Sequence, residues 1–442
     1  MESTVSLSKQ REKLIETYKH ASINDLPTPS FVVDLNIVKQ NCKRMLDGIE
    51  AISPDLRFRP HVKTHKTAEI VRIQLDNGRN HKSVVASTIS EIRGLVPLAQ
   101  DGTVRDILYG IPPTRSKVPT LAEISQELHA FGTTLRLMID SPDQLGFLTE
   151  YSERHPSYVL PWSIFIKINV GDNRAGQTLA SSDLTQVIRQ ALGSSPKIIS
   201  LYGFYAHAGG SYSSTSIDSA SEYLDREVSG VYEAAVLARS ILDSTPASSP
   251  QRRFVLSVGA TPTAHASAMA TFDRVTNLFA KVMQDDELEI HAGNYAMLDM
   301  QQVATGLVSP ANIAGTVVAE IITYYSDRDE YLIDAGVLAL AREPGRIPGI
   351  ATIRGQTVSG DRYVVGRVSQ EHGIITKRTD KIENVIEEES LLDEASITKS
   401  WSPGDRVVLL PQHSCITSSM YQWYFVVEDD RVVDIFLPWR MW

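Results

Sequence analysis

Short apolar stretches rich in β-branched residues alternate with helical patterns from residue 31 to about residue 293. Several stretches are nearly continuous apolar runs, which is typical of strands buried on both faces of a parallel sheet. The predicted strands are Phe31–Leu35, Leu56–Lys63, Ser83–Thr88, Asp106–Ile111, Leu135–Asp140, Ser163–Val170, Ile199–His207, Phe254–Ala260 and Leu288–Gly293. Their alternation with helices predicts an α/β architecture.

Helical patterns fill the intervals between these strands. Apolar residues recur at helical spacing over residues 38–49, with Asn36 as the predicted N-cap, and over residues 184–192, where Gly193 is a stop signal. A longer helix is predicted from about Ile217 to Leu242. Eight or nine strand–helix units in succession favour a TIM-type (β/α)8 barrel. An open, doubly wound sheet is the alternative that periodicity leaves open.

The pattern changes after about residue 312, where strand-like runs follow one another with turn signals and no long helical pattern between them. The predicted strands are Thr316–Tyr325, Glu330–Asp334, Arg362–Val368, Arg406–Leu410, Trp423–Val427 and Arg431–Phe436. We therefore predict three parts: an N-terminal helical extension (1–23), the barrel (24–311) and a mostly antiparallel β domain (312–442).

Composition places the chain among ordinary globular proteins, with 42% apolar and 22% charged residues. A formal net charge of −10 disfavours sequence-independent nucleic-acid binding. No stretch approaches the ~20 apolar residues of a membrane span, and the polar N-terminus lacks the apolar core of a signal peptide. With two cysteines, Cys42 and Cys415, no disulfide framework is indicated, so we expect a reducing, cytoplasmic location.

The basic segment Arg59–Lys66 stands at the end of the second predicted strand and reads Arg-Pro-His-Val-Lys-Thr-His-Lys. Barrel enzymes carry their chemistry at the carboxyl ends of the strands. Lys63 can form a Schiff base there, provided that burial and positive neighbours lower its pKa. The candidate neighbours are Arg59, His61, His65 and Lys66. On spacing alone, a solvated basic loop is the alternative.

This segment closely resembles the pyridoxal-5'-phosphate (PLP) lysine motif of eukaryotic-type D-serine dehydratases and D-threonine aldolases, within the alanine-racemase-like fold. The resemblance continues in the family's order over roughly residues 25–440. It runs through Ala86–Glu91, Asp106–Leu108, Asp140–Pro142, Lys167–Gly176, Ser257–Thr263, His291–Tyr295, Asp334–Gly336, Glu371–Gly373 and Leu410–Cys415. It implies a PLP-binding barrel, a C-terminal β domain, a homodimer, and Lys63 as the Schiff-base lysine.

Two glycine-containing stretches match the family's phosphate-binding loops. The first holds Gly259, Ala260 and Thr261, after a strand and at the start of a helix, where backbone N–H groups and the helix dipole favour an anion. The second, after the last barrel strand, holds Gly293, Asn294 and Tyr295. Without the family, a helix N-cap turn and an ordinary turn are the better interpretations of these stretches.

Three further residues are candidates for contacts to the cofactor ring or substrate. Arg174 matches the family's arginine near the cofactor's phenolic oxygen, which a fixed guanidinium suits. His207 and Tyr212 close another strand, although a packed, hydrogen-bonded histidine is nearly as good a reading of His207. The family more often shows Gly-His-Ser-Tyr at this point, so the pair Gly209–Gly210 departs from its pattern.

His413 and Cys415 end a predicted strand of the β domain, where residues i and i+2 of an extended chain face the same side. A lone His-x-Cys is a weak metal signal, and a buried thiol beside a packed histidine is the alternative. His-x-Cys is the zinc-binding pair of D-serine dehydratases, so the resemblance implies that His413 and Cys415 bind zinc here. Thiolate with imidazole favours Zn²⁺, whereas a carboxylate at the second position, as in related bacterial aldolases, suits Mn²⁺ or Mg²⁺.

The resemblance implies a lyase that acts on a small D-β-hydroxy amino acid. Lys63 would remove the α-proton, and the metal would help the β-hydroxyl leave, giving pyruvate and ammonia from D-serine. The alternative is retro-aldol cleavage to glycine and an aldehyde, as in D-threonine aldolases, and Cys415 favours the dehydratase. We expect Glu371, His372 and Met441 near the site without an assigned role, and we expect neither nucleic acid nor membrane as a partner.

Borohydride reduction should fix the cofactor to Lys63, because the Arg59–Lys66 segment predicts the Schiff base there. The measurement is peptide mapping of the reduced protein by mass spectrometry. A Lys63→Ala variant is the control and should carry no label. A label on another lysine in the unmodified chain would contradict the assignment.

Overall fold

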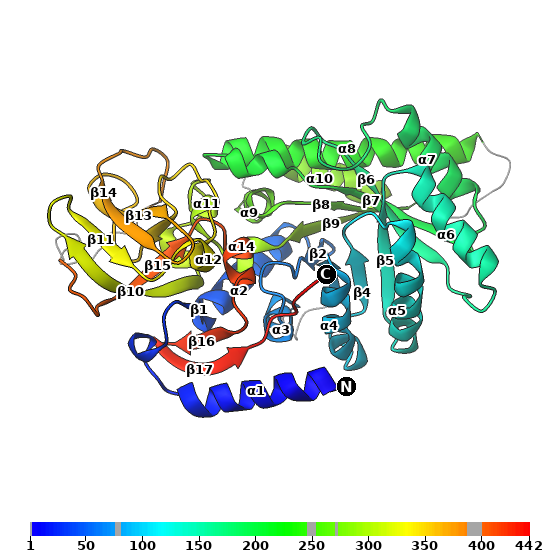
Figure 1. Ribbon diagram of the computed structural model, residues 1–442. Helices are drawn as coiled ribbons and strands as arrows, with labels where there is room; N and C mark the ends of the chain where they lie inside the picture. Colours follow the sequence, from blue (N-terminus) through cyan, green and yellow to red (C-terminus); the bar gives the residue numbers. More distant parts are fainter. Residues whose placement is uncertain (1, 76–80, 245–252, 270–272, 387–399) are drawn as a thin grey trace.

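Two β-sheets organise the chain, and both are seen in Figure 1. The computed structural model describes residues 2–75, 81–244, 253–269, 273–386 and 400–442. One sheet forms the barrel half of the molecule and the other the C-terminal half. Among the described helices, none combines the length and apolar character needed to cross a bilayer.

Eight parallel strands form the barrel, in the order β2-β9-β8-β7-β6-β5-β4-β3. They are β2 (Arg57–Pro60), β3 (Ser83–Ala86), β4 (Asp106–Tyr109), β5 (Thr134–Ile139), β6 (Trp162–Ile168), β7 (Ile199–Ala206), β8 (Val255–Val258) and β9 (Glu287–Ala292). The ring closes between β2 and β3, where the Val62 N–H donates to the Val85 carbonyl at 3.0 Å. The TIM-type barrel is thus confirmed, and the open-sheet alternative is wrong.

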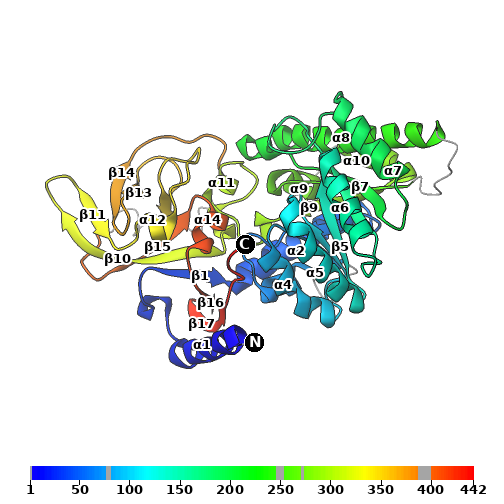
Figure 2. The same cartoon turned by 45° about the vertical axis from the view of Figure 1, so that its right-hand side comes forward.

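Helices surround the barrel, as the two views of Figures 1 and 2 show. They are α2 (Leu35–Ile52), α3 (Ala68–Leu75), α4 (Ile89–Gln100), α5 (Val118–Ala130), α6 (Pro142–Arg154), α7 (Ser182–Gly193), α8 (Ile217–Asp243), α9 (Thr261–Met269) and α10 (Asp273–Asp285). The N-cap of α2 is Asp34, whose side chain accepts from the Ile37 N–H at 3.0 Å, and the prediction of Asn36 is wrong. The helix begins directly after a strand, so the last strand residue takes the cap.

Strand β1 (Ser30–Asp34) lies in the second sheet, and its predicted place in the barrel is wrong. It pairs antiparallel with β10 (Gly315–Tyr325) and parallel with β16 (Tyr424–Glu428). Phe31, Val32 and Val33 are all buried, which suits a strand covered on both faces in either sheet. An apolar run shows that a strand is buried, but it does not select its partner.

The second sheet has nine strands in the order β11-β14-β13-β12-β15-β10-β1-β16-β17. Its further members are β11 (Glu330–Ile333), β12 (Ala351–Ile353), β13 (Arg362–Val368), β14 (Gly373–Arg378), β15 (Arg406–Pro411) and β17 (Arg431–Phe436). Pairing of β10 with β11 closes six of the strands into a small antiparallel barrel. The sequence patterns missed β12, which has only three residues, and β14, which begins in the Glu-His-Gly motif.

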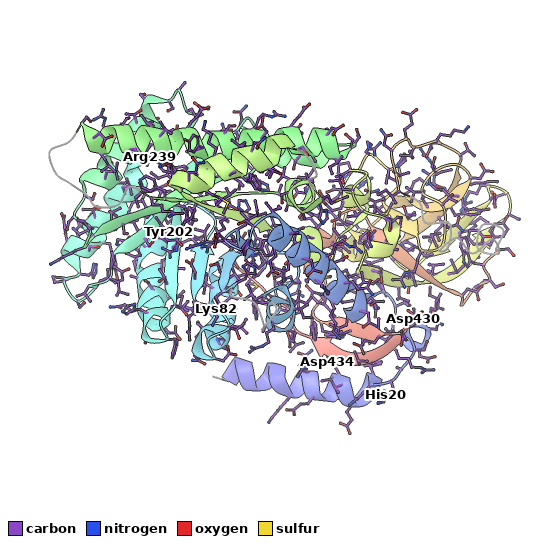
Figure 3. All side chains as sticks on the ribbon, turned by 180° about the vertical axis from the view of Figure 1, so that it is seen from behind. His20, Lys82, Tyr202, Arg239, Asp430 and Asp434 are labelled. Atoms are coloured by element: carbon purple, nitrogen blue, oxygen red, sulfur yellow. The ribbon has the colours of Figure 1, made fainter. Side chains whose placement is uncertain are left out.

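The predicted N-terminal helix is present as α1 (Glu2–Tyr18), and it contacts β17. The Arg11 guanidinium pairs with the Asp434 carboxylate at 2.8 Å, and the His20 N–H donates to the Val432 carbonyl at 2.8 Å. Figure 3 shows Asp434 and His20 beside this helix. The N-terminal helix therefore covers the edge of the second sheet formed by β17.

An ion-pair cluster fills the barrel interior near the amino ends of its strands. Arg59 is fully buried, and its Nη1 lies 2.6 Å from Asp106 Oδ1 while its Nε lies 2.7 Å from Glu289 Oε1. Arg136 Nε contacts the other Asp106 oxygen at 2.7 Å. Burial alone would raise the pKa of Asp106, but Arg59 and Arg136 outweigh burial and lower it. The carboxylate therefore stays ionised between two guanidinium groups.

Replacing Arg59 by Met should destabilise the protein by about 3–5 kcal/mol, because it leaves the buried Glu289 carboxylate without a partner. The measurement is the shift of the thermal unfolding midpoint, followed by circular dichroism. Arg154→Met is the control, since Arg154 forms an exposed i,i+4 pair with Glu150 and its loss should cost less than about 1 kcal/mol. Equal shifts for both variants would show that the cluster adds no special stability.

Candidate active site

A cavity of about 320 Å³ lies where the carboxyl ends of the barrel strands meet the C-terminal domain. Its barrel lining comes from the ends of β2, β6, β7, β8 and β9, and the C-terminal domain adds Glu343, His413 and Cys415. Eleven of the twelve predicted site residues line it: Lys63, Arg174, His207, Tyr212, Gly259, Ala260, Thr261, Gly293, Asn294, His413 and Cys415. The exception is Tyr295.

Lys63 follows β2, and its N–H donates to His61 Nδ1 at 3.3 Å. The residues predicted to supply positive charge around Lys63 are either ion-paired or neutral, so this prediction is wrong. Arg59 is paired in the barrel interior, and Lys66 pairs with the buried Glu91 carboxylate at 2.5 Å. Burial lowers the pKa of His61 well below its usual range and that of His65 to about 4, so both rings are neutral near pH 7.

The two glycine loops lie side by side at the ends of the adjacent strands β8 and β9. Gly259 has φ +146°, and a Cβ there would come within 2.0 Å of the His291 carbonyl oxygen, so only glycine fits. The Asn294 N–H donates to Thr261 Oγ1 at 3.1 Å and joins the loops. Among the described residues, none forms a hydrogen bond with the buried Asn294 Oδ1. Bare backbone beside the start of α9 suits a phosphate group.

Tyr295 turns its side chain away from the cavity into the core. The ring is fully buried and packs edge-on against Phe58, with 5.5 Å between centroids. The hydroxyl interacts with the Cys42 thiol. Only the backbone of Tyr295 remains available to the cavity as a predicted cofactor contact.

The Arg174 segment and the end of β7 are tied together by the Gly209–Gly210 pair. Both glycine N–H groups donate to the Asp172 carboxylate, at 2.9 Å for Gly210. A Cβ at Gly209 would come within 2.9 Å of that carboxylate. The Asp172 carboxylate therefore ties the end of β7 to the turn that carries Arg174.

His207 is both a packed, hydrogen-bonded histidine and a residue of the cavity wall, which are the two interpretations that its sequence position allowed. Its Nδ1 lies 2.7 Å from the Gly259 carbonyl oxygen and donates to it, while the ring lines the cavity. Burial, reinforced by Lys167 and Arg174, lowers its pKa well below the usual range. The ring is therefore neutral, and its other nitrogen is an acceptor that faces the cavity side.

His413 and Cys415 converge, although not by the predicted extended geometry. Strand β15 ends at Pro411, His413 is the N-cap of α14 (Ser414–Ser419), and Cys415 lies in the first helical turn. The imidazole and the thiol nevertheless lie close enough that each shifts the pKa of the other. Cys415 Sγ also lies 3.1 Å from Thr64 Oγ1, directly beside Lys63. The lysine loop and the His–Cys pair thus share one site.

The donor atoms of this pair suit a metal once the imidazole has lost its proton. Burial lowers the pKa of His413, but the Cys415 thiolate, Asp299 and Glu343 outweigh burial and raise it to about 9. Burial raises the pKa of Cys415, but His413 and Lys63 outweigh it and lower the pKa. Thiolate and imidazole are the donor set that Zn²⁺ prefers. Within the described part of the chain, no group of three or more His, Cys, Asp or Glu side chains is placed to hold a metal ion.

Sequence patterns missed several residues that complete the site. The ring of His291 stacks on Tyr205 with 4.0 Å between centroids, and its buried Nε2 has no hydrogen-bond partner. Lys167 Nζ lies 4.6 Å from the centre of the Tyr205 ring, and burial and Arg174 lower its pKa to about 7. His61, Gln301 and Glu343 also line the cavity. His291 and Lys167 stood inside segments that carried the family resemblance, whereas Glu343 had no signal.

Asp299 is the buried carboxylate that links the cofactor loop to the His–Cys pair. The Asn294 side-chain amide and the Ser414 N–H both donate to its Oδ2, the latter at 2.9 Å. Its Oδ1 caps α11 (Met300–Val303) by accepting from the Gln302 N–H at 3.0 Å. Asp299 is fully buried, which raises its pKa, although His413 opposes that effect.

Three residues that we expected near the site do not line the cavity. Glu371 and His372 are exposed in the turn between β13 and β14. Met441 is 73% exposed at the C-terminal tail. The tail itself does return to the lysine loop, because the Trp439 N–H donates to the Lys66 carbonyl at 2.7 Å.

Comparisons with known proteins agree with this two-part site. The family model "Alanine racemase, N-terminal domain" matches residues 33–281, and the model "Putative serine dehydratase domain" matches residues 314–427. A D-serine dehydratase of Schizosaccharomyces pombe is 40% identical over 99% of this chain and 97% of its own length. A D-serine dehydratase of Saccharomyces cerevisiae is 34% identical over 97% of this chain and 99% of its own length.

Solved structures share the fold. D-threo-3-hydroxyaspartate dehydratase from Delftia sp. superposes with a TM-score of 0.73 at 24% identity, covering 95% of this chain and all of that one. A cysteine-to-alanine mutant of that enzyme was solved in a metal-free form, and it superposes with a TM-score of 0.73 at 23% identity. A D-threonine aldolase from Filomicrobium marinum has a TM-score of 0.67 at 18% identity and covers 94% of this chain and 95% of its own.

Iodoacetamide should alkylate Cys415 in metal-stripped protein far faster than Cys42 at pH 7. The lowered pKa of Cys415 keeps its thiolate populated, whereas burial raises the pKa of Cys42 to about 12. His413→Ala should slow the reaction at Cys415, because the thiol pKa rises when the cation is lost. Rates are read by mass spectrometry between pH 5 and 9, and the rate at Cys415 should fall as the pH drops through its pKa. An unchanged rate in the variant would show that His413 does not stabilise the thiolate.

Proposed function

This chain belongs to the family that joins an alanine-racemase N-terminal domain to a serine dehydratase domain, and we propose that it is a PLP-dependent lyase that converts D-serine to pyruvate and ammonia. The observation that carries the proposal is the contact between Thr64 and Cys415 at 3.1 Å. This contact brings the lysine loop and the His–Cys pair into one cavity. The relatives at 40% and 34% identity, both D-serine dehydratases, support the same reaction.

The residues present fit PLP. Lys63 would hold the cofactor covalently, the backbone of Gly259 to Thr261 with Gly293 and Asn294 would hold the phosphate, and Arg174 would face the phenolic oxygen. When bound, PLP supplies an electron sink for the bond that breaks at Cα. The neutral rings of His207 and His291 border this space and accept or donate hydrogen bonds without adding charge.

Lys63 Nζ is the group that would take the α-proton, since it is a lysine at the cavity wall beside the proposed metal pair. His413 and Cys415 would hold Zn²⁺, which supplies Lewis-acid assistance to the departing β-hydroxyl. This step removes one water molecule from D-serine. Hydrolysis of the resulting unsaturated amine takes one water molecule up again, so the net products are pyruvate and ammonia. Asp299 positions the pair by fixing the Ser414 N–H.

Retro-aldol cleavage of a D-β-hydroxy amino acid to glycine and an aldehyde is the second candidate. The same cavity could bind such a substrate, and a 3-hydroxy-D-aspartate aldolase of Paracoccus denitrificans is 20% identical to this chain. The thiolate at Cys415 favours dehydration, because it holds Zn²⁺ rather than Mn²⁺ or Mg²⁺, which are weaker Lewis acids. The higher identity of the dehydratases favours it further.

We also propose a homodimer in the cytoplasm. Helices α12 (Val337–Leu340) and α14 meet through a Thr417 hydroxyl that donates to the Leu340 carbonyl at 2.9 Å. Exposed apolar side chains lie on and just beyond these helices: Leu338, Ile416 and Met420. Such a patch beside the cavity suits a second copy of the chain. Both cysteines are free thiols, which suits a reducing compartment.

Purified protein loaded with PLP and Zn²⁺ should produce pyruvate from D-serine and little glycine. Strong chelation should abolish pyruvate formation while the bound-cofactor absorbance persists, because the metal acts on the hydroxyl rather than on the cofactor. The measurement scores keto acid and glycine separately over D- and L-serine, threonine and 3-hydroxyaspartate. Glycine and aldehyde as the main products would establish the aldolase, and full turnover in chelator would refute the metal assignment.

A further inference from the structure

Glu343 is the carboxylate among the described residues that line the cavity, and the proposed reaction gives it no role. It lies between α12 and β12, in a stretch without sequence signal. Its side chain is 39% exposed, and its Oε2 lies 3.8 Å from His413 Nδ1. The carboxylate therefore stands beside His413, at the proposed metal pair.

The backbone around Glu343 is held from several directions, so its position is fixed. Ala341 turns the chain after α12 with φ +64°. The Gln301 amide donates to the Pro344 carbonyl at 2.8 Å. A Cβ at Gly345 would come within 2.0 Å of the Gln412 side chain, which directly precedes His413. Gln412 Nε2 also donates to the Ile347 carbonyl at 2.8 Å.

We propose that Glu343 sets substrate specificity by excluding amino acids that carry a second carboxylate on Cβ. This inference rests on the proposed function, which places the β-hydroxyl at the His413–Cys415 pair. The two remaining substituents on the same carbon then lie on the side of the cavity that holds Glu343. Both are hydrogens in D-serine, whereas one is a carboxylate in 3-hydroxyaspartate.

The sign and size of the effect follow from charge. Two carboxylates a few ångströms apart in a partly buried cavity repel each other, which should weaken binding of the dicarboxylate on the order of 10- to 100-fold. A neutral Cβ substituent meets no such penalty. The relative from Delftia is a dehydratase of D-threo-3-hydroxyaspartate, so the shared fold is compatible with either substituent. In this chain, the charge of Glu343 would select substrates with a neutral Cβ substituent over those with a carboxylate.

D-aspartate and D-alanine isolate this effect, because they differ only by the β-carboxylate and lack the hydroxyl that leaves. Protein loaded with PLP and Zn²⁺ is titrated with each ligand, and Kd is read from the change in cofactor absorbance. The ratio of Kd for D-aspartate to Kd for D-alanine should fall at least 10-fold in Glu343→Gln. Glu123→Gln is the matched control, since it removes the same charge from the exposed face of α5 and should leave the ratio unchanged.

An unchanged ratio in Glu343→Gln would overturn the proposal. Loss of bound Zn²⁺ in Glu343→Gln, measured by competition with a chelator, would also overturn it, because Glu343 would then act by orienting His413. A lower ratio with Zn²⁺ retained supports it. Failure of the proposed function is seen separately, as wild-type protein that forms no pyruvate from D-serine while D-alanine still shifts the cofactor spectrum.

Discussion

The buried carboxylate of Asp299 is the interaction on which the site depends, because the site is assembled from two parts of the chain. One oxygen accepts from both Asn294, in the proposed phosphate loop, and the Ser414 N–H, between His413 and Cys415. Burying a carboxylate is costly unless its oxygens are hydrogen-bonded, and here three donors satisfy it. The distance between the cofactor loop and the metal pair is thereby fixed by one side chain.

Three of the histidines that line the cavity are neutral, so only a few of its side chains carry charge. Burial lowers the pKa of His61, His207 and His291 well below the usual range, so three rings contribute polarity without cations. Positive charge at the cavity comes from Lys63 and Arg174, and negative charge from the Cys415 thiolate and Glu343. Lys63 lies next to Thr64, which contacts Cys415, and Lys63 helps to lower the pKa of that thiol. Opposite charges therefore meet where the lysine loop contacts the His–Cys pair.

Most of the fold could be predicted from the sequence, because buried parallel strands leave continuous apolar runs that alternate with helical patterns. The place of β1 could not, since its burial suits either sheet and its partners lie hundreds of residues away. The prediction of a positive field around Lys63 was wrong for a similar reason. Glu289 and Glu91, which pair with Arg59 and Lys66, come from another strand and from a helix. The convergence of His413 and Cys415 was predicted on the wrong local geometry, because the strand ends at Pro411 and Cys415 lies in the helix that follows. Neither Asp299 nor Glu343 stands in a motif, and only the folded backbone brings them to the cavity.

The position of β1 has a consequence for biosynthesis. Strand β1, at residues 30–34, finds its partners only in β10 and β16, at residues 315–325 and 424–428, so it stays unpaired until both of these segments have been synthesised. The barrel strands, by contrast, all precede residue 293 and can pair as they emerge. Contacts of such high sequence separation form slowly and leave strand edges exposed meanwhile. A nascent chain of this protein would therefore carry a finished barrel with an unpaired strand β1, and a premature stop before Tyr424 would leave β1 without its neighbour β16.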